Sequence, residues 1–179
     1  MLTVAPPDAF ELRTNGTFEA LMWALSRPGD SRDMPEAGLA PVIEALVDLE
    51  CAVFADAPDL RAEVAATGAL LVDDFSQADH VFLSSLEGIE PRLASLRCGS
   101  TLYPDDGATL VAVARHGTGQ RLRLSGPGID GVTEISLGVS PGFWALRDLL
   151  CAYPEGFDVF FVDGRSVIGI PRSTKVEVL

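Results

Sequence analysis

The stretch over residues 107–131 constrains this chain most, because it joins two strand patterns of different kinds through glycine-rich turns. Residues 107–115 are apolar at both odd and even positions, which is typical of a strand covered on both faces of a sheet. Residues 121–125 alternate leucine with arginine or serine, so we expect one buried face and one face that meets water or an anion. The short segment 116–120 between them predicts a central hairpin.

Helix and strand patterns alternate along the rest of the chain. Apolar side chains spaced i, i+3, i+4 and i+7 predict a first helix with one buried stripe, formed by Phe18, Leu21, Met22 and Leu25. We expect Thr17 to cap this helix and residues 1–13 to form an extended N-terminal arm. Further helices are predicted over 41–47, 59–67, 91–97 and 141–153, and strands over 51–55, 69–72, 80–84, 132–137, 157–162 and 166–170. The alternation predicts an α/β fold, and the short turn at 163–165 makes its sheet mixed.

Size and charge limit the classes of function. A chain of 179 residues predicts a single domain, 1–179. Its net charge of −13 is spread along the whole sequence, so nucleic acid and anionic membranes are poor partners. The N-terminus lacks the features of a signal peptide, and no run of about 18 apolar residues is present, so we expect a cytoplasmic protein.

The cysteines and histidines indicate no redox or metal site. Cys51, Cys98 and Cys151 are odd in number and far apart, which favours three buried thiols in a reducing compartment. His80 and His116 are isolated in the sequence, so we predict neither a zinc cluster nor a nucleophile–base pair.

Residues 126–131, GPGIDG, match the G-x-G-x-x-G dinucleotide fingerprint. The context favours a tight turn over a nucleotide site. Pro127 removes a backbone donor, Asp130 adds a negative charge, and the residues that follow favour a strand, whereas a dinucleotide site needs a helix.

Other candidate groups are few. Lys175, the single lysine, stands in a β-branched tail, which favours a surface position over a Schiff base with pyridoxal phosphate. Adjacent carboxylates at 73–74 and 105–106 favour solvated turns over a cation site. Arg27, in a tight turn, and Arg172, after a proline, are the best candidates for gripping an anion or a partner carboxylate, although surface charge is the alternative for both.

Four motifs occur together and in order: FEALMWALSRPG (residues 18–29), GATL (107–110), LRLSGPGI (122–129) and IPRSTKVEV (170–178). With them the chain resembles PhnH, the H subunit of the bacterial carbon–phosphorus lyase system for phosphonate metabolism. The resemblance covers nearly the full chain. It implies a three-layer α/β/α fold similar to the large domain of pyridoxal-phosphate-dependent transferases, without the cofactor and its lysine.

The resemblance also implies partners and a reaction. The family works with the G, I and J subunits, in a step where a phosphonate displaces adenine from ATP to give a ribose 1-phosphonate 5-triphosphate. No catalytic residues are carried over, so we expect an assembly subunit of this transferase complex that forms a homodimer when alone. The alternative is a stand-alone binder or enzyme for a phosphorylated metabolite that uses Arg27 and Arg172.

Overall fold

The computed structural model of the protein describes residues 6–179. Its centre is a seven-stranded sheet with the order β1-β9-β8-β5-β4-β2-β3, and a three-stranded sheet, β10-β6-β7, lies beside it. The strands are β1 (Ser31–Asp33), β2 (Ala52–Ala55), β3 (Leu70–Leu71), β4 (His80–Leu83), β5 (Thr109–Val113), β6 (His116–Ser125), β7 (Thr133–Leu137), β8 (Asp158–Asp163), β9 (Ser166–Ile170) and β10 (Lys175–Val178). The α-helices are α1 (Ala9–Ser26), α2 (Ala40–Leu46), α3 (Pro58–Thr67), α4 (Glu90–Leu93) and α5 (Pro141–Leu150).

The larger sheet is mixed, as predicted. Strands β3, β2, β4, β5 and β8 pair in parallel, whereas β9 and then β1 add to β8 in antiparallel fashion. The predicted hairpin at 163–165 is confirmed as the β8–β9 turn. Parallel neighbours need long crossovers, and the helices between these strands supply them.

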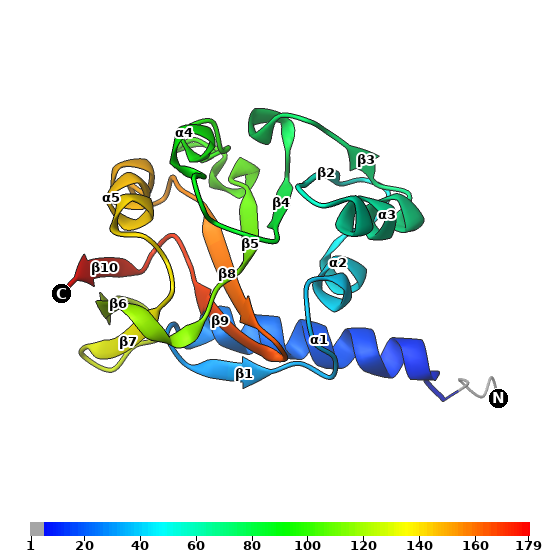
Figure 1. Cartoon of the computed structure of the whole chain (residues 1–179), viewed down its shortest axis with the longest axis horizontal. Helices are drawn as coiled ribbons and strands as arrows, with labels where there is room; N and C mark the ends of the chain where they lie inside the picture. The colour runs from blue at the N-terminus through cyan, green and yellow to red at the C-terminus, as the bar shows by residue number, and fades with distance from the viewer. Residues whose placement is uncertain (1–5) are drawn as a thin grey trace.

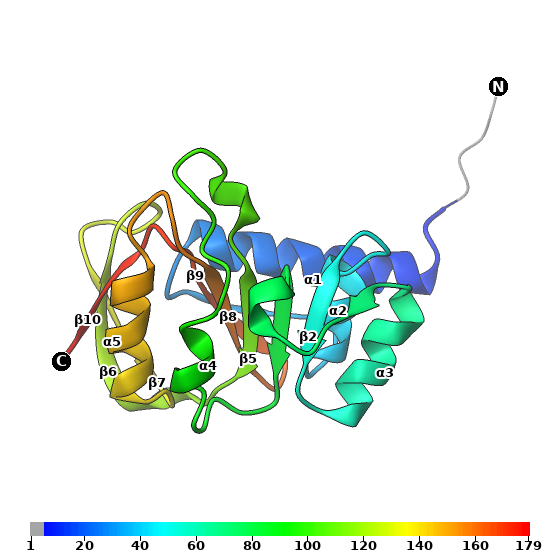
Figure 2. The ribbon, with the colours of Figure 1, turned by 90° about the horizontal axis from the view of Figure 1, so that it is seen from above.

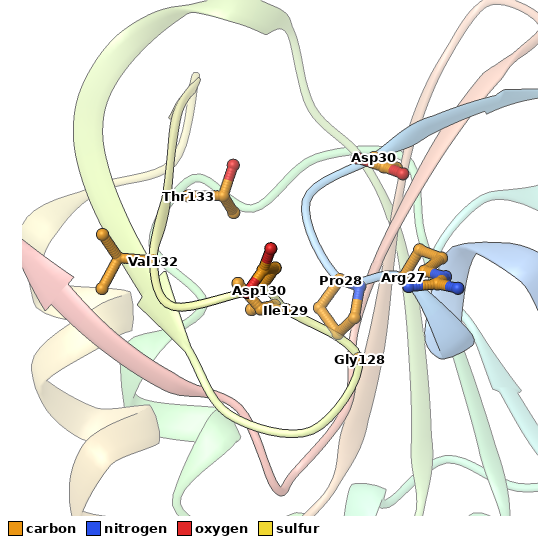
Figure 3. Close-up of a pocket in the computed structure, with 8 residues that line it drawn as sticks. All are labelled: Arg27, Pro28, Asp30, Gly128, Ile129, Asp130, Val132 and Thr133. Atoms are coloured by element: carbon orange, nitrogen blue, oxygen red, sulfur yellow. The ribbon is translucent and has the colours of Figure 1, made fainter.

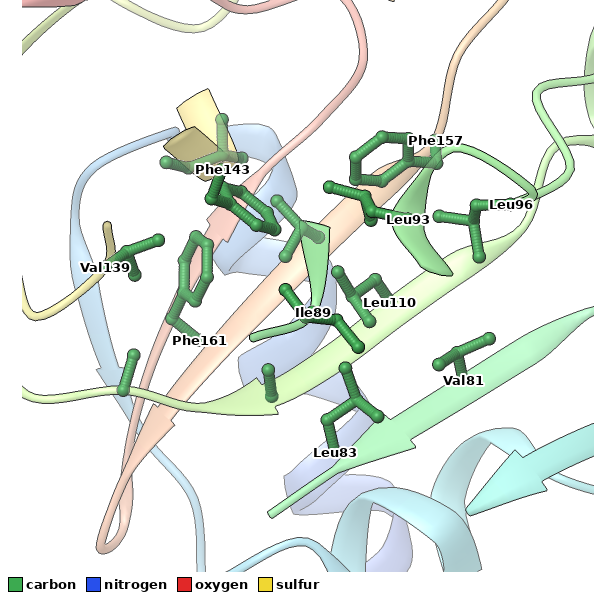
Figure 4. Packing of buried hydrophobic residues seen from close by; sticks show 14 of the residues in the cluster. Val81, Leu83, Ile89, Leu93, Leu96, Leu110, Val139, Phe143, Phe157 and Phe161 are labelled. Atoms are coloured by element: carbon green, nitrogen blue, oxygen red, sulfur yellow. The ribbon is translucent and has the colours of Figure 1, made fainter. Parts of the chain in front are cut away.

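Helices cover both faces of the larger sheet (Figures 1 and 2). One hydrophobic core joins α1, α2 and α3 to one face, through residues such as Leu21, Ile43 and Val64. The second core lies on the opposite face, under α4, α5 and the small sheet, and includes Leu93, Phe143 and Leu122. Figure 4 shows this second core, where side chains from α4 and α5 pack over β4, β5 and β8. The predicted α/β class is therefore confirmed, with a second sheet in addition to the predicted helices.

The predicted central hairpin at 107–125 was wrong, although both strands exist. β5 pairs with β4 and β8, so neither of its edges is open to β6. β6 pairs instead with β7 and β10. The chain passes from one sheet to the other at residues 114–115. The burial pattern of β6 is as predicted, and so is that of β5 except at its last residue, Val113, which is 42% exposed.

The extended arm predicted over residues 1–13 was also wrong where the structure describes it. α1 begins at Ala9, and Asp8 caps it in a capping box with Glu11. Residues 1–5 lie outside the described part. Thr17, the predicted cap, is buried inside the helix, where its hydroxyl donates to the carbonyl of Arg13 at 3.1 Å.

The buried face of α1 differs from the predicted stripe. Leu21 is buried, but Phe18 and Met22 are 48% and 49% exposed. The helix packs through small residues instead, because a Cβ added to Gly169 of β9 would lie 2.7 Å from the carbonyl carbon of Ala24. The contact lies on the side of α1 that carries Ala20, Leu21 and Ala24, and Phe18 and Met22 lie outside it.

The remaining helices follow their predicted signals. Pro41 stands in the first turn of α2, Gly68 ends α3 with φ +85°, and Ser140 caps α5. α4 is shorter than the predicted 91–97. Within the described residues, no helix is long and apolar enough to cross a membrane.

Candidate functional site

Arg27 lies where the turn after α1 meets the loop between β6 and β7. It follows α1, and its backbone N–H donates to the carbonyl of Trp23 at 3.0 Å. The β6–β7 loop packs against this turn and encloses a pocket of about 260 Å³. The pocket is lined by Arg27, Pro28, Asp30, Gly128, Ile129, Asp130, Val132 and Thr133 (Figure 3).

Glycines permit this contact. Gly128 has φ +83°, and a Cβ there would lie 2.2 Å from the carbonyl oxygen of Ser26. Gly29 has φ +92°, and its Cβ would meet Thr133 Cγ2 at 3.0 Å. Two of the four sequence motifs, SRPG and LSGPGI, therefore meet in space because neither backbone carries a side chain at the contact.

The loop at 126–131 is a turn between antiparallel strands. β7 follows it, where a dinucleotide site would require the N-terminus of a helix. The predicted tight turn is confirmed, and the glycines of the fingerprint serve the contact with α1.

The Arg27 pocket is not strongly cationic. In Figure 3 the guanidinium of Arg27 extends away from Asp130 and Ile129. Asp30 and Asp130 also line the pocket, so its lining carries two carboxylates and one guanidinium. The contact of Arg27 with an anion or a partner carboxylate stays a prediction.

Arg172 is held by several internal hydrogen bonds. Its Nε and Nη2 donate to the two carboxylate oxygens of Asp158 at 3.3 and 2.8 Å, and its Nη1 donates to the carbonyl of Pro104. The hydrogen bonds to Asp158 raise the pKa of Arg172. This bidentate pair fixes the segment after β9 against β8.

Arg27 and Arg172 line two pockets that share no residue. The structure therefore does not bring the two predicted residues to one ligand. It brings Arg172 instead to a residue that sequence reasoning missed, Arg147 of α5, which is only 3% exposed. A signal for it was present, since Arg147 stands three and four residues after the core residues Trp144 and Phe143.

His116 is isolated in the sequence but hydrogen-bonded on both ring nitrogens in the structure. Its Nδ1 lies 3.0 Å from Ser166 Oγ and its Nε2 lies 3.1 Å from the carbonyl of Phe161. Ser166 Oγ in turn contacts Ser31 Oγ at 2.5 Å. Burial lowers the pKa of His116. This chain of hydrogen bonds ties the start of β6 to the β8–β9 hairpin and to β1.

The other sequence candidates lie apart. Asp73 pairs with Arg61 at 3.3 Å, and Asp106 lies 3.8 Å from Arg97. Between residues 6 and 179 no three His, Cys, Asp or Glu side chains gather as a metal site. The cysteines are free thiols, but they are half-buried, not fully buried as predicted.

Two comparisons with known proteins agree on the class of this chain. The family model described as "Bacterial phosphonate metabolism protein (PhnH)" matches residues 10–177. A curated relative, the "Putative C-P lyase subunit protein HtxG" of Stutzerimonas stutzeri, is 36% identical over 178 residues, which cover 93% of this chain and 87% of the relative. The chain therefore belongs to the PhnH family of bacterial phosphonate metabolism proteins.

Proposed function

We propose that this protein is an assembly subunit of a carbon–phosphorus lyase complex in phosphonate catabolism. Its partners would be the G, I and J subunits. The complex would carry out the synthesis of ribose 1-methylphosphonate 5-triphosphate, in which a phosphonate displaces adenine from ATP. The relative named as a carbon–phosphorus lyase subunit supports this role. The proposal includes a single domain over 1–179, a cytoplasmic location, a fold like that of pyridoxal-phosphate-dependent transferases and a homodimer when the chain is alone.

The outer face of α1 exposes large apolar side chains. Phe18 and Met22 stand one helical turn apart, and both are about half exposed although they are large and apolar. Trp23 extends this surface toward the edge strand β1, where it lies under the guanidinium of Arg32 at 5.6 Å. We call Phe18, Met22 and Trp23 the α1 face. Clustered apolar side chains of this kind are typical of a surface that another subunit covers.

The test is native mass spectrometry of the chain co-expressed with the G, I and J subunits of the same system. We expect one defined complex, and we expect the double variant F18E/M22E to be absent from it, because two buried carboxylates would oppose the contact. Leu149→Glu is the matched control, since Leu149 is 79% exposed on α5, on the opposite side of the sheet.

Three results would count against the proposal. The wild-type chain could elute alone while the other subunits associate. F18E/M22E could assemble as well as the wild type, which would remove the α1 face from the argument. The control could lose assembly to the same extent as the double variant, which would point to a general effect of added charge.

A further inference from the structure

A second pocket, of about 200 Å³, lies between α5 and the segment that joins β9 to β10. Three of the chain's thirteen basic residues line it, together with a single carboxylate. The lining residues are Arg147, Asp148, Cys151, Tyr153, Arg172, Ser173, Thr174 and Lys175. Such a concentration of positive charge is unusual in a chain with a net charge of −13.

Arg147 is the unusual member of this pocket. Its Nη1 donates to the carbonyl of Thr174 at 3.2 Å and its Nη2 to the carbonyl of Pro171 at 2.8 Å. No carboxylate forms an ion pair with it among residues 6–179, and its buried Nε lacks a hydrogen-bond partner there. Burial lowers the pKa of Arg147, which reflects the cost of holding a desolvated charge.

Thr174 also carries a buried polar atom without a hydrogen-bond partner among the described residues. The residue is 2% exposed, and the atom is its Oγ1. Buried polar atoms in native proteins are nearly always paired, and a buried guanidinium without a counter-ion is costly. Arg147 and Thr174 both line the pocket, so its wall holds a buried positive charge without a carboxylate partner among residues 6–179, which favours a ligand with negative charge.

The other two cations play different parts. Arg172 is neutralised by its bidentate pair with Asp158, so it mainly orients the segment 171–174. Lys175 is exposed and stands at the start of β10, where its backbone is fixed by pairing with Ser125 of β6. A lysine there acts as a point charge toward an anion in the pocket, and the hydroxyl of Ser173 supplies a further donor.

We propose that this pocket binds a tetrahedral oxyanion, the phosphate or phosphonate group of a small molecule, through Lys175, Ser173 and the guanidinium of Arg147. Arginine and lysine donors with hydroxyl groups are the usual ligands of such groups. The carboxylate of Asp148 repels the anion and so weakens its binding. The site does not depend on the assembly role, because it is built within one chain and lies on the side of the sheet opposite to the α1 face.

The experiment is isothermal titration of the purified full-length chain, in separate runs, with inorganic phosphate and with methylphosphonate at matched ionic strength. We expect saturable binding at one site for at least one of them. Binding of methylphosphonate identifies a phosphonate group as the ligand, and binding of phosphate alone identifies a phosphate group.

Two surface variants give effects of opposite sign. Lys175→Ala is expected to weaken binding about tenfold, because it removes the exposed cation. Asp148→Asn is expected to tighten binding about threefold, because it removes the opposing charge. Arg61→Ala, a change of charge in the distant α3, is the matched control and leaves the affinity unchanged. Arg147→Gln abolishes binding if the chain folds, which circular dichroism reports.

The absence of saturable binding for both probes would overturn the site. So would an equal loss of affinity in Lys175→Ala and Arg61→Ala, because each removes one positive charge and a non-specific effect of net charge does not depend on position. Failure of the subunit complex to form would leave these titrations unaffected, so the two proposals fail separately.

Discussion

β5 and β6 are consecutive strands, yet they are stabilised in different ways. β5 lies between two parallel neighbours in the larger sheet, and its side chains enter the cores on both faces, with Leu110 in one and Val111 in the other. β6 buries Leu122 and Leu124 on one face only.

The other face of β6 is held by charge. Glu134 of β7 accepts hydrogen bonds from Arg121 and Arg123, and Arg123 also reaches Glu177 of β10 at 3.3 Å. These groups are exposed, so water and salt screen them. The larger sheet therefore buries apolar side chains on both faces, whereas the small sheet combines one buried face with a solvated ladder of ion pairs.

The largest expected effect is in the larger sheet. Phe161 of β8 is fully buried, with its ring 5.9 Å from Phe143 and 5.7 Å from Trp144 of α5. Phe161→Ala is expected to lower the free energy of unfolding by about 3–5 kcal/mol through lost burial and a cavity. Urea denaturation measures this, with Leu149→Ala, which should stay within about 0.5 kcal/mol, as the exposed control. Equal losses for both would contradict apolar burial as the cause.

The joint between α1 and the small sheet comes next. Gly128→Ala is expected to cost about 2 kcal/mol or more, because alanine resists positive φ and its Cβ would clash with the backbone of Ser26. Gly164→Ala is the control, with φ +62° but no atom within 4 Å of the added Cβ, and should cost about 1 kcal/mol. Equal melting temperatures for the two variants would mean that the contact with Ser26 is not the reason for glycine at position 128.

Each sheet also carries one histidine that titrates. Burial lowers the pKa of His80 in β4 and of His116 in β6 from the ordinary 6.5. Above pH 6.5 both states are neutral and the shift costs nothing. Below it, the unfolded chain takes up the proton first, so the free energy of unfolding falls until the pH passes the lowered folded value.

His80 is expected to contribute more of this loss than His116. The Nδ1 of His80 is buried without a hydrogen-bond partner among the described residues, and only the charges of Asp79 and Asp48 oppose the lowering of its pKa by burial. The lowering of the pKa of His116 by burial is opposed by a direct hydrogen bond to Phe161 in addition to the charge of Asp163. Urea denaturation between about pH 7.5 and 5.5 should therefore show a flatter profile for His80→Phe than for His116→Phe. The reverse order would contradict burial as the dominant cause.

The smallest effect is expected on the charged face of β6. Arg123→Ala removes contacts with Glu134 and Glu177, all of them exposed. The melting temperature should fall only slightly, and the difference from wild type should vanish in about 1 M sodium chloride, where the Debye length is about 3 Å. A loss that persists at high salt would mean that packing of the arginine stem, not its charge, supports the small sheet.

Local signals predicted most elements. The prolines in the first turns of α2 and α5, Gly68 after α3 and the turn at 163–165 each act within a few residues, so the chain itself carries the information. The family resemblance rested on motifs in register and is confirmed. The candidate site was predicted less well, since Arg172 was found but Arg147 was overlooked as part of an ordinary helix.

The amino-acid sequence by itself determined the α/β class, the mixed sheet, the burial pattern of β5 and β6 and the membership of the PhnH family. Only the tertiary structure decided which strands pair, which face of α1 meets the sheet and which cations share a pocket. The reason is physical: helix caps and turns depend on neighbours in the chain, whereas the packing of Ala24 on Gly169, and of Arg147 under residues 171–174, depends on surfaces more than twenty residues apart.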